Sequence, residues 1–252
     1  MKPFDVPTAL DSLRDAYLSA ADLLAAAGTG SRDARYALAR LWLSEGIPFA
    51  FRARPAVYES LRLWLARRLG LQAKEITLVG SARQGFSLTP GPNLGRPFGE
   101  HSDLDLTVVS LSLFTGLAAV FERWRSDYGA GVVVPRGSCE RRYWDANVES
   151  VPRGLERGFI DPHKIPTWNR YPEAQKVAQS VFEAAEKLKA TGNAPHVNHV
   201  SVRVYSDWDS FVRQLAMNLE VAARPPAPGK DSRALRRAGL IASDASGPDR
   251  SQ

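Results

Sequence analysis

The chain has 252 residues, and its 33 Lys and Arg against 27 Asp and Glu give a formal net charge of +6. Apolar residues make up 44% and charged residues 24%, an ordinary globular composition that excludes a collagen-like repeat, a coiled-coil rod or wholesale disorder. A single cysteine, Cys139, excludes an internal disulfide and a four-cysteine zinc site. No apolar run approaches the about 18 residues of a membrane span, and the N-terminus lacks a signal-peptide pattern, so we expect a soluble cytoplasmic protein with no membrane partner.

Half of the net positive charge lies at the C-terminal end. Residues 223–252 hold six basic and three acidic residues and carry +3, which leaves +3 for residues 1–222. The end segment has too little apolar content to pack, so we expect a disordered basic tail. A nucleic-acid-binding module that rests on charge alone stays a third hypothesis, and it predicts an affinity that falls steeply with salt.

The first seventy residues show helical spacing of apolar residues and recognisable helix ends. A first helix is expected from Thr8 past residue 20, and a second, capped by Ser31, is expected to bury Leu41. Pro55 suits the first turn of a third helix, which stops at Gly70.

The rest of the chain mixes strands with helices. Strands are expected at residues 75–79, 103–109, 132–134 and 197–205, and helices near 112–127, 138–150, 173–190 and 208–222. Residues 86–102 and 151–171 are expected to be irregular, because they are rich in Gly and Pro or in Pro alone. These elements predict an α+β fold in one domain, residues 1–222, with a small mixed sheet at about 75–205 flanked by helices 8–69 and by a helical C-terminal part.

Two carboxylates open one of these strands. Asp103 and Asp105 are two positions apart, so they point to the same side of the strand. Like-charged carboxylates so close favour a bound divalent cation, and their hard oxygens select Mg²⁺ or Mn²⁺. Gly80 and Ser81 follow the preceding strand directly, and such a turn offers backbone N–H groups and a hydroxyl to a triphosphate. The combination predicts phosphoryl or nucleotidyl transfer.

These residues also resemble a known signature. Gly80-Ser81, Arg83 and Gly85, followed by Ser102-Asp103-Leu104-Asp105-Leu106, are similar to the motif of the DNA-polymerase-β-like nucleotidyltransferase superfamily. That superfamily includes poly(A)-adding enzymes, aminoglycoside nucleotidyltransferases, cyclic-oligonucleotide synthases of antiphage systems and toxin–antitoxin nucleotidyltransferases. The longer stretch from Gly80 through Phe98 resembles a bacterial subgroup of unknown activity.

The resemblance implies a nucleotidyltransferase-like fold and a role for each motif residue. Asp103 and Asp105 would be catalytic and would bind Mg²⁺ or Mn²⁺, while Gly80, Ser81 and Arg83 would bind ATP or another nucleoside triphosphate. The acceptor, which is a small molecule, RNA or a protein, stays open. The implied setting is antiphage defence or a toxin-type system.

The chain departs from the family pattern in two places. Ser81 and Asp103 are 22 positions apart, which is longer than usual, and the excess is the loop 86–102. The family also has a third carboxylate on a later strand, but the polar face of residues 197–205 offers Ser201 and Arg203 instead. The third metal ligand is therefore either Asp207, displaced along the strand, or missing.

Arg203 on that face would replace part of a metal's charge. It would favour the alternative hypothesis, a catalytically degenerate nucleotidyltransferase fold that binds a nucleotide or a partner. Asp161 and Lys164 lie in a proline-flanked segment, where they either line the nucleotide pocket or belong to an ordered turn capped by Asp161. The turn is our expectation.

Overall fold

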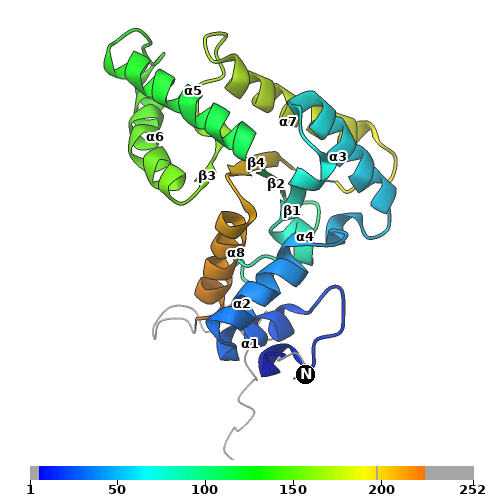
Figure 1. The fold of residues 1–252 in the computed structure, drawn as a ribbon. Coiled ribbons are helices and arrows are strands. Elements are labelled where there is room, and N and C mark those ends of the chain that lie inside the picture. The colour runs from blue at the N-terminus through cyan, green and yellow to red at the C-terminus, as the bar shows by residue number, and fades with distance from the viewer. Residues whose placement is uncertain (1–5, 197, 225–252) are drawn as a thin grey trace, which may run out of the picture.

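A small mixed sheet lies at the centre of the molecule (Figure 1). The computed structural model describes residues 6–196 and 198–224, so nearly all of the expected tail lies outside the described residues. The strands are β1 (Ile76–Val79), β2 (Leu104–Val109), β3 (Phe159–Ile160) and β4 (Val200–Tyr205), in the order β1-β2-β4-β3. β2 is antiparallel to β1 and parallel to β4, and β3 is antiparallel to β4. The expected α+β class with a small mixed sheet is confirmed.

Two groups of helices lie at opposite ends of the molecule (Figure 1). One comprises α3 (Pro55–Leu69), α5 (Leu111–Gly129), α6 (Ser138–Glu156) and α7 (Pro172–Ala190). The other comprises α1 (Ala20–Thr29), α2 (Arg32–Leu38) and α8 (Trp208–Ala223). The short helix α4 (Ser81–Gln84) follows β1, and single turns of 3₁₀-helix lie at Thr8–Leu10, Phe49–Phe51, Ala73–Glu75 and Pro162–Lys164.

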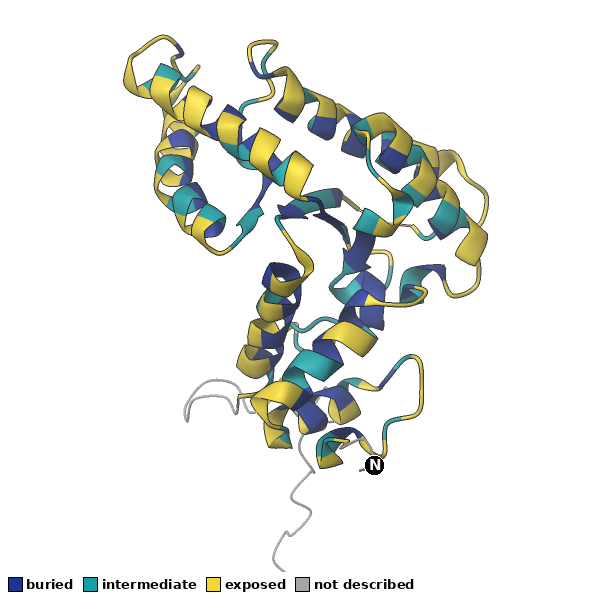
Figure 2. Cartoon of the chain, viewed as in Figure 1, coloured by how far each residue is buried: buried dark blue, intermediate teal, exposed yellow. Residues whose placement is uncertain are grey.

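The sheet separates two hydrophobic clusters (Figure 2). Leu78, Leu106 and Val204 point from the strands into the larger cluster, which α3, α5 and α7 cover. The smaller cluster joins α1, α2 and α8 and includes Val109 and Tyr205 from the opposite face of the sheet. Strand alternation therefore gives the central strands one apolar face and one face that is partly polar.

The N-terminal helices differ from the expectation at two points. Thr8–Leu10 form only a 3₁₀ turn, and the first α-helix begins later, after Ser19. The Ser19 hydroxyl caps α1, since its Oγ atom accepts a hydrogen bond from the backbone N–H of Asp22 at 3.1 Å and donates one to the Asp22 carboxylate at 2.7 Å. The second helix does begin after Ser31, but it continues as a π-helix over Ala39–Ser44. The wider turn shifts the side-chain phase and leaves Leu41 54% exposed instead of buried.

The strand expected at residues 132–134 is wrong. The backbone N–H groups of Val132 and Val133 donate to the carbonyl of Asp127, at 2.8 and 3.3 Å, and so extend the C-terminal turn of α5. Val132 and Val134 are exposed. α6 is also longer than expected, since it continues through Pro152 to Glu156. The helices expected at Pro55, at 173–190 and at 208–222 are all confirmed within one or two residues.

Candidate functional site

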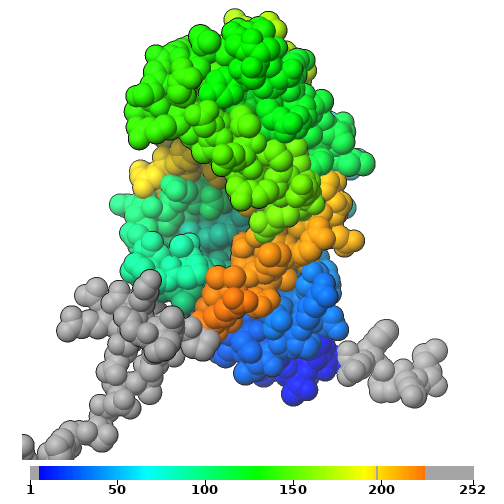
Figure 3. All heavy atoms as spheres, turned by 90° about the vertical axis from the view of Figure 1, so that its left-hand side faces the viewer, coloured from blue at the N-terminus to red at the C-terminus, as the bar shows by residue number. Residues whose placement is uncertain are grey.

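A cavity of about 600 Å³ lies against the polar face of the sheet, between the sheet, α8 and the loop after α4. In Figure 3 the surface is hollowed beside the orange helix α8, between it and the cyan-green segment that carries this loop. The cavity is lined by Gly80 and by side chains with polar atoms: Ser81, Gln84, Ser87, Thr89, Asp103, Asp105, Thr107, Asp161, His163, Ser201, Arg203, Tyr205 and Asn218. Four of the five motif residues therefore line one cavity, and Arg83 does not.

The acidic wall of the cavity is formed at the start of β2. Asp103 directly precedes the strand and is exposed, and Asp105 is half-buried. The Oδ1 atom of Asp105 accepts a hydrogen bond of 2.8 Å from the hydroxyl of Ser201. Ser201 is the β4 residue in register with Asp105, so the pairing of the two strands fixes this contact.

Gly80 lies against the same carboxylate. Its φ of 66° and ψ of −157° fall in a region that is essentially restricted to glycine. A Cβ atom at this position would come within 2.9 Å of the Oδ2 atom of Asp105. The turn therefore needs glycine both for its backbone conformation and for the space that the Asp105 side chain occupies.

Arg83 points away from the cavity, contrary to its expected role. Its side chain is only 4% exposed, and its guanidinium lies next to Gly46 in the N-terminal part of the chain. Its Nε and Nη1 atoms are buried and have no hydrogen-bond partner among the described residues. Burial lowers the pKa of Arg83, an effect that nearby Tyr58 and Tyr17 only partly oppose.

Asp207 does not complete the acidic wall. It is the N-cap of α8, and its Oδ1 atom accepts the backbone N–H of Ser210 at 2.7 Å. Hydrogen bonds from Ser206 and Ser210 lower the pKa of this carboxyl group. Asp207 is also not among the residues that line the cavity. Helix capping accounts for it, so the displaced third ligand is not found there.

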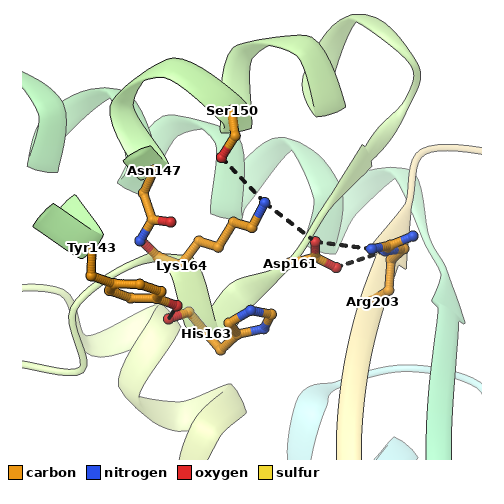
Figure 4. A network of polar contacts seen from close by, with 7 residues as sticks. All are labelled: Tyr143, Asn147, Ser150, Asp161, His163, Lys164 and Arg203. Atoms are coloured by element: carbon orange, nitrogen blue, oxygen red, sulfur yellow. Dashed lines mark hydrogen bonds and ion pairs between the residues drawn. The ribbon is translucent and has the colours of Figure 1, made fainter. Parts of the chain in front are cut away.

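A third carboxylate does line the cavity, but it is paired with a cation (Figure 4). Asp161 follows β3 and accepts hydrogen bonds from Arg203 on β4: Nε to Oδ1 at 2.6 Å and Nη2 to Oδ2 at 3.0 Å. Lys164 adds its Nζ atom 3.8 Å from Oδ2. The expectation that Asp161 caps its own turn is wrong, because its side chain makes no capping hydrogen bond.

The ion pair of Asp161 and Arg203 determines the electrostatics of this second polar wall of the cavity. Burial works against the charge of Arg203, but its hydrogen bonds to Asp161 outweigh that and raise the pKa of Arg203. His163 also lines the cavity, and burial lowers its pKa, which favours the neutral imidazole. The alternation along residues 197–205 gave the orientation of Arg203, but it carried no signal for His163.

The remaining wall is apolar. It is formed mainly by α8, through Phe211, Leu215 and Val221, and by Leu43 and Leu88 from other segments. Such a surface suits a planar base or another apolar group, while the polar walls suit phosphates. The helical spacing of Phe211 and Leu215 predicted a buried face for this helix, but the sequence did not indicate that part of it lines a site.

The donors at the acidic wall fit one magnesium or manganese ion. Mg²⁺ prefers hard oxygen ligands and is commonly held by one or two carboxylates, with waters and substrate phosphates completing the set. Asp103 and Asp105 supply that number of carboxylates, with the hydroxyl of Ser201 adjacent. Across residues 6–196 and 198–224, no group of three or more His, Cys, Asp and Glu side chains has an arrangement that could hold a metal.

A second hollow, of about 420 Å³, lies between α3 and α7 and is mostly apolar. It contains Trp64 and Lys187 and none of the motif residues.

In the described part of the chain, no helix combines the length and the apolar content needed to cross a bilayer. Comparisons with protein-family models, curated proteins and solved structures find no match to this chain.

Proposed function

We propose that this protein is a metal-dependent nucleotidyltransferase, which moves a nucleotidyl group from a nucleoside triphosphate to an acceptor. The proposal is carried by one observation: the Gly80-Ser81 turn and the carboxylates of Asp103 and Asp105 line the same cavity, although 22 positions separate Ser81 from Asp103. The contact between Gly80 and Asp105 supports it further, because the turn and the carboxylate are fitted to each other.

The proposed reaction joins an acceptor oxygen to the α-phosphorus of the nucleotide. The acceptor hydroxyl attacks that phosphorus and releases its proton to solvent, the bond to the oxygen that bridges the α- and β-phosphates breaks, and pyrophosphate leaves. A divalent ion held by Asp103 and Asp105 would neutralise the charge that develops on the phosphate oxygens. The Ser81 hydroxyl and the backbone of the turn would orient the triphosphate, and the apolar surface of α8 would take the base.

The size and the chemistry of the cavity agree with this assignment. Its volume of about 600 Å³ falls within the range of about 300–1,000 Å³ that small-molecule sites occupy. The acceptor class stays open among a small molecule, RNA and a protein side chain. The expected setting, antiphage defence or a toxin-type system, rests on the motif resemblance.

The experiment that tests the proposal is transfer of label from α-³²P-labelled ATP, GTP, CTP and UTP, each with Mg²⁺ or Mn²⁺, followed by chromatography. We expect labelled product from the wild-type chain and a loss of about 100-fold or more in Asp105→Asn, a magnitude typical of removing a group that acts on the transition-state charge. Asp209→Asn is the matched control, since Asp209 is exposed on α8 and lies outside the cavity. Equal transfer by wild type and Asp105→Asn would sink the assignment.

A second candidate, a nucleotide-binding module without catalysis, is favoured by a specific observation. The cavity-facing side of β4 carries Ser201 and Arg203 and no acid, whereas the family pattern has a carboxylate on a later strand, and Arg203 is paired with Asp161. Equilibrium binding of the same nucleotides separates the two functions. Binding that needs Asp105 but gives no product with any nucleotide or metal would establish the binding module.

A further inference from the structure

The β4 strand decides how many metal ions the cavity can take. β4 runs parallel to β2, with Ser201 opposite Asp105 and Arg203 opposite Thr107. Both β4 side chains face the cavity. The strand position nearest the acidic wall thus carries a neutral hydroxyl, and the next position on the same face, about 6.6 Å along, carries a cation.

A pair of metal ions does not fit this arrangement. Two divalent ions about 3.5–4 Å apart bring four positive charges and need carboxylates that bridge them. Asp103 and Asp105 supply two negative charges, and the third cavity carboxylate, Asp161, is already paired with Arg203. A second ion would therefore lie in a site short of negative charge, and beside a cluster in which two cations, Arg203 and Lys164, face the single carboxylate of Asp161 and leave a positive charge that repels the ion.

Arg203 is held firmly but keeps donors for a ligand (Figure 4). Asp161 binds it through two nitrogen atoms, and the ring of Phe159 lies 4.5 Å from its Cζ atom. The side chain of Asp161 is 8% exposed, while that of Arg203 is 38% exposed. Of the five N–H groups of a guanidinium, the hydrogen bonds to Asp161 use two, and Tyr205 also interacts with the group, so the exposed part of the guanidinium keeps donors for phosphate oxygens in the cavity.

We propose that the cavity binds one divalent cation rather than two, on Asp103 and Asp105, and that Arg203 supplies the second fixed positive charge that holds the triphosphate. This inference rests on the proposed function and specifies how its substrate is bound. Ser201 positions Asp105 for the single ion, and Asp161 positions Arg203 for the phosphates.

The first measurement counts the bound ions. Mn²⁺ binding is followed by electron paramagnetic resonance, alone and with an ATP analogue whose methylene group replaces the oxygen that bridges the α- and β-phosphates. GTP, CTP and UTP analogues are used in turn. We expect one protein-dependent Mn²⁺ per chain in the wild type. Ser201→Asp adds a carboxylate beside Asp105 and is expected to bind two, which shows that the method can count a second ion.

Two protein-dependent ions in the wild type overturn the inference and leave the proposed function standing. No protein-dependent ion, with or without any analogue, overturns both. One ion in Ser201→Asp, with one ion in the wild type, contradicts the argument that missing carboxylate charge limits the site. The readout is metal stoichiometry, so these outcomes do not depend on whether an acceptor has been found.

The second measurement tests Arg203 by the affinity for the same analogues. The double variant Asp161→Asn/Arg203→Met removes both charges together, so that no carboxylate is left buried without a partner. We expect it to bind the analogue about tenfold or more weakly and still to bind one Mn²⁺, since the charged hydrogen-bond donors to the phosphates are removed while Asp103 and Asp105 are kept. Asp161→Asn alone keeps the arginine and one oxygen acceptor for it, and is expected to lose less affinity than the double variant does.

Arg157→Met is the matched control. The Cζ atom of Arg157 also lies over the Phe159 ring, 5.4 Å from its centre, but Arg157 donates a hydrogen bond to the side chain of Gln214 and does not line the cavity. Analogue affinity that is equal in the double variant and the wild type, with both folded by circular dichroism, means that the Arg203–Asp161 pair is only structural, and it overturns the proposal. Equal weakening by Arg157→Met and by the double variant overturns it too, because the loss is then not specific to the arginine that lines the cavity.

Discussion

The two ends of the cavity both carry carboxylates, but they differ in what faces them. At the β2 end, Asp103 and Asp105 form no ion pair within the described residues, and Asp105 accepts a hydrogen bond from a hydroxyl and lies against a glycine. At the β3–β4 end, Asp161 is buried and neutralised by Arg203 and Lys164. An unpaired pair of carboxylates attracts a cation, whereas a neutralised carboxylate does not, so the difference supports the proposal that a metal ion binds at the β2 end and that the other end presents fixed positive charge.

The largest effect on metal binding at the β2 end is expected from filling the space beside Asp105. Gly80→Ala places a Cβ atom within 2.9 Å of the Asp105 carboxylate and forces an alanine into a backbone region that side chains avoid. We expect Mn²⁺ affinity to fall by about 10-fold or more, as metal sites do when a group that orients a ligand is changed. Isothermal titration of the folded protein, below its melting temperature, measures this.

Gly70→Ala controls for the positive φ. Gly70 has a φ of 74° at the end of α3, and a Cβ atom there would meet nothing within 4 Å. This variant should lose about 1 kcal/mol of stability and no Mn²⁺ affinity. If both variants lose Mn²⁺ affinity equally, the contact between Gly80 and Asp105 is not what holds the site.

At the β3–β4 end, we expect a substitution to lower the free energy of unfolding. Arg203→Met leaves the Asp161 carboxylate buried without its main partner, a change that costs about 3–5 kcal/mol in a fully buried pair. Because Arg203 is 38% exposed, we expect a smaller loss of about 2 kcal/mol by urea unfolding. The double variant Asp161→Asn/Arg203→Met should recover part of that loss.

Glu186→Gln provides the comparison with an exposed pair. Its partner Lys189 lies 2.7 Å away, and both side chains are at least half exposed. The variant should lose no more than about 0.5 kcal/mol. If Arg203→Met costs no more than Glu186→Gln, then the buried carboxylate is solvated and the two ends of the cavity differ less than their geometry indicates.

The contrast between the two ends was only half predictable from the sequence. Local patterns were sufficient for the β2 end: strand alternation put Asp103 and Asp105 on one side, and the Gly-Ser turn indicated what lies beside them. The same alternation gave the direction of Arg203. Its partner Asp161 is 42 positions away, directly after a strand of only two residues, and no local pattern reveals which distant residue such a neighbouring strand brings in.

Arg83 and Asp207 show the other limit of local patterns. α4 has only four residues, which is too short for a helical period to tell its buried side from its cavity side, and Arg83 lies on the buried side. Asp207 has the side-chain direction of a ligand in a strand, but it follows the strand end, where an aspartate also caps a helix. In each case two local roles compete, and tertiary packing decides between them.

Substitution of Arg83 shows whether this arginine, which is close in sequence to Gly80 and Ser81, binds the nucleotide or is only buried in the protein. Its Nε and Nη1 atoms lack partners in the described structure, so Arg83→Met removes an uncompensated charge while it keeps much of the side-chain volume. We expect a gain of about 1 kcal/mol in unfolding free energy and unchanged nucleotide affinity. Arg67→Met, which removes an exposed arginine, should change stability by less than about 0.5 kcal/mol. Weaker nucleotide binding in Arg83→Met, with no gain in stability, would return Arg83 to the nucleotide site.

The smallest expected effect concerns an acid–arginine pair outside the cavity, which shows what pairing does at the surface. Asp127 accepts hydrogen bonds from Arg170, at 2.7 and 3.2 Å, and from the Tyr171 hydroxyl at 2.9 Å. The hydrogen bond from Arg170 lowers the pKa of Asp127, and the hydrogen bond from Tyr171 adds to this effect. Burial raises the pKa of Tyr171 to about 12, to which its hydrogen bond with Asp127 also contributes. A carboxyl group with a lowered folded-state pKa stabilises the fold above its unfolded pKa of about 4, and that contribution is lost as pH falls through the folded value.

Asp127→Asn should therefore lower the melting temperature at pH 7 and converge with the wild type as pH falls from about 4 toward 2, because the wild-type carboxylate is then protonated too. Differential scanning fluorimetry of the two proteins at each pH gives the difference directly, and the titration of all other groups cancels in it. A difference that stays constant over this range would mean that the link between α5 and the start of α7 depends on shape and not on charge. It would also imply that Asp161, the buried counterpart, must be tested by charge removal and not by pH.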